Sequence, residues 1–175
     1  MAIERSLFLE IVKDAYSAYY SIVPDGEAGD LPLAFRADYK ARDERYVFVK
    51  SASIWRNEKL EYAYVFSAPS IDGETARKCI DWAWQDMLPR VKPHKEHQYT
   101  NCKVVFIADS VPKDTASVVK QSKASKSYGF LSTQGYSELI TAAVDLSTEE
   151  TVTNRVGRGL EKFFYKLFAL RHEEA

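Results

Sequence analysis

The chain has 175 residues, 46% of them hydrophobic and 28% charged, with a formal net charge of −1 at pH 7. This composition excludes a disordered chain, a membrane-spanning run of roughly 18 apolar residues and a strongly basic coat for nucleic acid. Because two cysteines, Cys79 and Cys102, are too few for a disulfide scaffold and the N-terminal segment carries no secretory signal, we expect one soluble, cytoplasmic domain over residues 1–175, with no membrane partner.

Residues 3–22 are predicted to form a helix with one broad apolar face. The residues at helical spacing that define this face are Leu7, Ile11, Ala15, Ala18 and Ile22. Proline, glycine and aspartate over residues 24–32 end the helix, and residues 33–40 alternate between apolar and polar side chains. This alternation predicts a strand at the margin of a sheet.

Residues 45–67 are predicted to form a β-hairpin around which the rest of the chain is organised. Two runs rich in aromatic and β-branched residues flank a polar stretch at residues 56–59, so we expect the turn there, with Trp55 paired with Leu60. Both faces of this hairpin would be largely apolar. A sheet that leaves one face in water alternates cleanly, so the hairpin is expected to have helices above and below it.

A second helix is predicted to begin after Asp72, which is a suitable N-cap, with Glu74 in its first turn. Residues 90–101 are polar and charged, which is typical of a surface connection. Residues 103–109 contain a continuous apolar run without alternation. This pattern predicts a strand that is covered on both faces and lies parallel to a neighbour.

The last third of the chain is predicted to contain two helices and two strands. A helix with few apolar residues runs from Pro112 to Gly129, a strand follows at residues 138–146, and a short strand at residues 151–154 leads into a final helix capped by Asn154.

These elements predict an α/β fold of the α+β type. We expect a single three-layer α/β/α domain with a mixed sheet, in the order αβββαβαββα.

One motif indicates metal chemistry. Pro24 and Asp25 are followed by Asp38, Tyr39 and Lys40, which match the signature of the PD-(D/E)xK nucleases. The predicted order of helix, three-strand meander, helix and strand also resembles the restriction-endonuclease-like core. This resemblance implies that acidic residues hold a divalent metal ion while Lys40 activates water. The alternative is that Asp38 and Lys40 form the solvated face of a marginal strand.

Two basic segments are candidates for binding an anion. Arg155, Gly157 and Arg158 stand at the start of the final helix, where backbone amides and guanidinium groups can bind phosphate or carboxylate. The alternative is that the glycines permit close packing while the arginines face solvent. The preceding helix carries cations that could contact phosphates, namely Lys113, Lys120, Lys123 and Lys126. The alternative is that these lysines only form the solvated side of the helix.

Two further groups of residues were considered as sites. His94, His97 and Cys102 have the residue types of a zinc site, but their charged surroundings favour a solvated loop, so we expect no metal. The eleven tyrosines could line a ligand groove, but they are expected to be core residues.

The sequence therefore favours a binding or interaction module for an anionic ligand or macromolecule, without a cofactor. The residues expected to bind are Arg155, Gly157, Arg158, Lys120 and Lys123. The alternative is a metal-dependent nuclease of the PD-(D/E)xK type that uses Asp38 and Lys40, and nucleic acid is the corresponding partner. A homodimer formed through the aromatic hairpin is a third possibility.

Overall fold

A computed structural model describes residues 3–24, 27–45 and 55–174. Within these ranges, seven strands form one mixed sheet in the order β1-β2-β3-β4-β6-β5, with β7 also paired to β6. The strands are β1 (Ser21–Val23), β2 (Leu33–Arg45), β3 (Trp55–Ala68), β4 (His97–Ala108), β5 (Ser125–Ser127), β6 (Tyr136–Asp145) and β7 (Glu150–Thr153). The helices are α1 (Arg5–Ser17), α2 (Gly73–Met87), α3 (Lys113–Gln121) and α4 (Arg158–Glu174), with short 3-10 helices η1 (Leu88–Arg90) and η2 (Phe130–Ser132).

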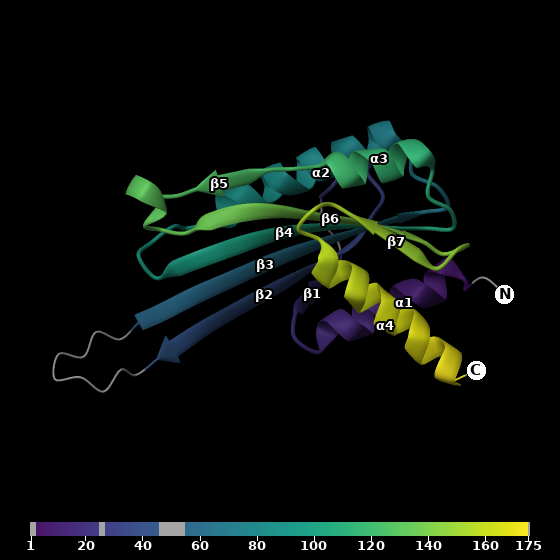
Figure 1. The fold of residues 1–175 in the computed structure, drawn as a ribbon, viewed down its shortest axis with the longest axis horizontal. Helices are drawn as coiled ribbons and strands as arrows, with labels where there is room; N and C mark the ends of the chain where they lie inside the picture. The colour runs from purple at the N-terminus through teal and green to yellow at the C-terminus, as the bar shows by residue number, and fades with distance from the viewer. Residues whose placement is uncertain (1–2, 25–26, 46–54, 175) are drawn as a thin grey trace.

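The helices cover both faces of the sheet, with α2 and α3 on one face and α1 and α4 on the other (Figure 1). Phe8 of α1 and Phe164 of α4 belong to one buried cluster, whereas Cys79 of α2 and Val119 of α3 belong to the second. The predicted α/β fold with a mixed sheet between helices is confirmed. Two observed strands, β1 and the three-residue β5, were not predicted, and the strand predicted before residue 56 lies largely outside the described residues.

Strand β3 pairs with β2, which begins at Leu33, so the predicted pairing of Trp55 with Leu60 is wrong. Strand β2 pairs antiparallel with β3 from Leu33 to Arg45, so Trp55 lies opposite Arg45, and Leu60 lies opposite Lys40. The predicted turn at residues 56–59 is therefore wrong, and the first strand expected before it falls at residues 46–54, outside the described residues. Polar residues are tolerated at this end of β3 because the facing end of β2 is also polar, with Glu58 in register with Arg42.

The base of the hairpin is covered on both faces, as predicted. Ala63 and Val65 lie in the cluster beneath α1 and α4, whereas Tyr64 and Phe66 lie in the cluster beneath α2. The opposite ends of β2 and β3 extend beyond the helices (Figure 1). Helices therefore enclose only the part of the hairpin nearest the core.

Strand β4 lies parallel to both β3 and β6, and its last five residues are buried on both faces, as the apolar run predicted. It begins at His97, so the predicted surface connection over residues 90–101 is too long. The predicted cap of α2 is confirmed, because the Asp72 side chain accepts a hydrogen bond from the Thr75 amide at 2.7 Å.

Helices α1 and α3 are shorter than predicted. Helix α1 ends at Ser17, before β1, and buries Phe8, Val12 and Tyr16, while Leu7 on the predicted face is 56% exposed. The buried face is centred instead on Phe8 and Tyr16, whose rings contact those of Phe168 and Phe163 in α4. Helix α3 ends at Gln121, so Lys126 lies on the edge strand β5.

Candidate functional site

Asn154 joins the end of α3 to the start of α4. Its buried side-chain amide donates to the carbonyl oxygens of Ser122 at 3.1 Å and Leu139 at 3.0 Å, and its Oδ1 accepts from the Thr141 amide at 3.3 Å. The predicted role of Asn154 as a helix cap is therefore wrong, because Asn154 lies before α4 and its side chain satisfies buried backbone groups elsewhere. Asn154 is thus hydrogen-bonded to Ser122. The residues that directly follow these two, Lys123 and Arg155, therefore lie at the same junction.

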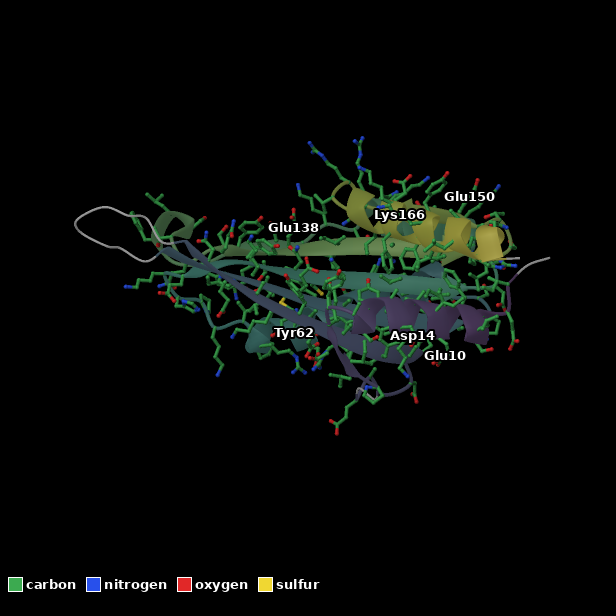
Figure 2. The ribbon with its side chains drawn as sticks, turned by 90° about the horizontal axis from the view of Figure 1, so that it is seen from below. Glu10, Asp14, Tyr62, Glu138, Glu150 and Lys166 are labelled. Atoms are coloured by element: carbon green, nitrogen blue, oxygen red, sulfur yellow. The ribbon has the colours of Figure 1, made fainter. Side chains whose placement is uncertain are left out.

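Exposed cations gather around this junction. On α4, the spacing of four residues between Arg158, Lys162 and Lys166 places them on one side of the helix. Figure 2 labels Lys166 and shows nitrogen-tipped side chains projecting from the start of α4, away from the sheet. We call the following set the basic surface: Lys120, Lys123, Arg155, Arg158, Lys162 and Lys166. Within the described part of the chain, none of these six side chains forms an ion pair.

A cavity of about 820 Å³ adjoins the basic surface between α4 and β7. Arg158, Lys162 and Lys166 line it on the α4 side, and Glu149 and Glu150 line it on the other. The Glu149 carboxylate already accepts hydrogen bonds from Arg171 at 3.0 Å and His172 at 2.7 Å. Glu150 and Glu161 also line this cavity, but within the described residues neither forms an ion pair with Arg158, Lys162 or Lys166.

Gly157 has a packing role at the start of α4. A Cβ atom at this position would lie 2.6 Å from the Cβ of Thr153 and 3.1 Å from the Thr141 oxygen. Its carbonyl oxygen accepts hydrogen bonds from the Leu160 and Glu161 amides, which form the first turn of α4. This crowding favours close packing over ligand contact as the reason for a glycine here.

Asp38 and Lys40 lie on the same side of β2, as predicted, and line a groove of about 510 Å³ with Glu58. Their charges are compensated by neighbours. Arg36 binds both carboxylate oxygens of Asp38, at 2.7 and 2.9 Å, and Lys40 lies 3.3 Å from Glu58. These hydrogen bonds to Asp38 are also the main reason that the pKa of Arg36 is raised. In the groove, Asp38 is therefore held by a guanidinium group.

The acidic partner implied by the nuclease motif, Asp25, lies outside the described residues. Among the residues that the structure does describe, no group of three His, Cys, Asp or Glu side chains could hold a metal ion.

His97 is buried and does not lie in a solvated loop, so that expectation is wrong. Its Nδ1 donates to the carbonyl oxygen of Gln134 at 2.6 Å, and its Nε2 lies 2.8 Å from the hydroxyl oxygen of Thr100. Both ring nitrogens are thus engaged in holding the start of β4. Cys102 is also buried, which raises the pKa of its thiol.

A polar cluster that the sequence did not predict lies on the α1 and α4 side of the sheet. Lys103 Nζ is 2.5 Å from Glu61 Oε2, and the Tyr20 hydroxyl donates to the same oxygen. The side chains of Lys103 and Glu61 are only 17% and 14% exposed. In the sequence, Glu61 and Lys103 are each a charged residue at an inward position of an apolar strand. This pattern does not reveal that the two side chains meet, because the contact depends on the parallel pairing of β3 and β4.

This cluster forms the floor of a cavity of about 490 Å³, which we call the tyrosine cavity. Tyr16, Tyr19 and Tyr20 contribute walls from the end of α1 and the residues after it, and Phe163 contributes a wall from α4. Burial, together with the hydrogen bond to Glu61, raises the pKa of Tyr20. The prediction that the tyrosines are core residues therefore holds for Tyr16 but not for the exposed Tyr19.

Comparison with known families matches residues 4–166 to a family described as Domain of unknown function (DUF8052). No curated protein and no solved structure matches the chain. The resemblance to the restriction-endonuclease-like core is therefore not confirmed. No helix in the described ranges is long and apolar enough to cross a membrane.

Proposed function

We propose that this chain, which belongs to the DUF8052 family, is a binding module whose basic surface binds an anionic macromolecule. Nucleic acid is the class to test first. The observation that carries this proposal is the set of six exposed cations around the junction of α3 and α4, which form no ion pair with any described residue. Unpaired cations on one surface attract phosphates even when the net charge of the protein is close to zero.

The spacing of the cations favours an extended anion over a small one. Residues four apart on a helix rise by about 6 Å, so Arg158, Lys162 and Lys166 span about 12 Å along α4. A single phosphate cannot contact all three, whereas a chain of phosphates can. Arg155 and Lys123 would extend the contact toward α3, because their neighbours Asn154 and Ser122 are hydrogen-bonded.

We further propose that the protein acts in the cytoplasm. Both cysteines are free thiols in the buried core, which suits a reducing compartment.

The test is the salt dependence of binding to a fluorescently labelled single strand of about 20 nucleotides, followed by anisotropy. One phosphate contact for each of the six cations predicts a slope of log K against log salt concentration of about −4, and the triple variant R155A/R158A/K162A should flatten that slope by about 2 units. The matched control K78A/K92A/K95A removes the same charge from exposed positions on α2 and in the segment after η1, outside the basic surface.

Binding lost by the first variant and kept by the control supports the proposal. Equal losses in both variants would mean that only net charge matters. Absence of binding by the unaltered protein at low salt would also overturn the proposal.

A metal-dependent nuclease remains the second proposal, and one observation favours it: Asp38, Lys40 and the Glu58 carboxylate line one groove. The cheapest test is a thermal shift with magnesium or manganese, followed by a nicking assay on plasmid DNA. A nuclease predicts a stabilising shift and nicking that Asp38→Asn abolishes. A protein with neither response to metal would retire this proposal.

A further inference from the structure

The tyrosine cavity has the size and walls of a small-molecule site. Its volume of about 490 Å³ lies within the range of about 300–1,000 Å³ that is usual for ligand pockets. Tyr16 lies edge-on to Tyr20, with ring centroids 4.9 Å apart, and tilted against Phe163 at 5.4 Å. Aromatic rings in such arrangements offer faces and edges against which a further planar ring can pack.

The floor of the cavity carries charges that the fold does not need. The Lys103 and Glu61 pair stands on the face of the sheet that otherwise carries apolar residues such as Ala63 and Val105. Removing two charges from water is costly, and apolar residues of similar volume usually stabilise a protein equally well or better. The pair therefore indicates a role other than stability.

Tyr16 has an unsatisfied hydroxyl group. Its side chain lines the cavity, only 5% of the residue is exposed, and its hydroxyl oxygen finds no hydrogen-bond partner within the described part of the chain. Buried polar groups are nearly always hydrogen-bonded, so a lone one requires an explanation. Burial, with a smaller effect of Glu61, raises the pKa of Tyr16, so the hydroxyl keeps its proton and remains a donor.

Two donors in the cavity have no acceptor within the described residues. Lys103 has three N–H groups, of which one donates to Glu61 and one is directed at the Tyr20 oxygen at 3.3 Å. The third N–H of Lys103 and the hydroxyl of Tyr16 both lack an acceptor among the described side chains. A ligand that satisfies these two donors must bring acceptor atoms.

We propose that the tyrosine cavity binds a planar aromatic ring that carries a carboxylate or carbonyl acceptor, with the ring packed against the side chains of Tyr16, Tyr20 and Phe163 and the acceptor on Lys103 and the Tyr16 hydroxyl. This site is separate from the basic surface, and its occupant is a small molecule instead of a macromolecule. Neither proposal depends on the other.

The test uses 4-fluorobenzoate and 4-fluorobenzamide as probes, with their binding followed by fluorine NMR. The carboxylate and the neutral carbonyl compound should both bind, and 4-fluorobenzylamine should bind more weakly, because it offers no acceptor to the Tyr16 hydroxyl and Lys103. Tyr16→Phe removes only the unsatisfied hydroxyl and should weaken both probes about fivefold, which corresponds to about 1 kcal/mol.

A second variant tests the floor of the cavity. Lys103→Met combined with Glu61→Leu leaves no charge unpaired and should weaken 4-fluorobenzoate at least tenfold, while Tyr165→Phe, which alters an exposed tyrosine outside the cavity, should leave binding unchanged. The proposal is overturned if the unaltered protein binds neither probe, if Tyr16→Phe binds as well as the unaltered protein, or if 4-fluorobenzylamine binds best. Thermal melts of each variant separate loss of the site from loss of the fold.

Discussion

Asn154 is predicted to contribute more stability than any exposed polar residue near it. Replacement by alanine removes the three hydrogen bonds, at 3.0, 3.1 and 3.3 Å, that its side chain makes to the backbone of Leu139, Ser122 and Thr141. Each lost bond leaves a backbone group without its partner, at a cost of about 1 kcal/mol. The expected loss is about 3 kcal/mol, equivalent to a fall of about 6–12 °C in melting temperature for a chain of this size.

Urea unfolding followed by circular dichroism measures this loss. Gln121→Ala is the matched control, because this exposed amide makes one hydrogen bond, to the hydroxyl of Ser117, and its removal should cost less than about 0.5 kcal/mol. Asn154→Asp keeps the shape but turns an oxygen toward two carbonyl oxygens, so it should destabilise at least as much as alanine at pH 7. A loss below about 1 kcal/mol for Asn154→Ala, or a well-tolerated aspartate, would refute this account of the junction.

Three further predictions concern groups that are buried or partly buried. Gly157→Ala should cost about 1–3 kcal/mol in urea unfolding, because the new Cβ would lie 2.6 Å from that of Thr153, and an unchanged midpoint would show that α4 can shift. The thiols of Cys79 and Cys102 are buried, so they should react with Ellman's reagent at pH 8 only after unfolding. Burial also raises the pKa of Cys79 to about 12. The contribution of this thiol to stability is therefore complete below about pH 8.5 and is lost as the pH rises toward 12. Burial opposes ionisation of Asp145, but hydrogen bonds from neighbouring hydroxyl and amide groups outweigh this effect and lower its pKa. The contribution of Asp145 to stability is therefore present above about pH 4 and is lost as the pH falls further. Asp145→Asn should make stability depend less steeply on pH in the acid range, and an unchanged dependence would contradict this.

Local pattern was sufficient to predict the layers of this fold. The apolar run in β4 and the apolar faces of the hairpin required helices on both sides, and the Asp72 cap marked the start of α2. The turn was misplaced because residues 56–59 have the composition of a loop. Their tolerance in β3 depends on the charged end of β2 opposite, a pairing that no local pattern reveals.

The candidate sites were only partly predictable for the same reason. Exposure of Arg155 and Arg158 followed from their place at a helix start, and the alternation of Asp38 and Lys40 placed both on one side of β2. The contact between Lys103 and Glu61 required the parallel pairing of β3 and β4, and therefore appeared only once the sheet was assembled.

The basic surface is tested most directly by mapping amide chemical shifts in a proton–nitrogen NMR titration with the 20-nucleotide strand. The account predicts that the perturbed amides cluster at residues 120–123 and 155–166, with the groove at Asp38 and Lys40 unaffected. Perturbations centred on that groove, or spread evenly over every exposed lysine and arginine, would contradict it.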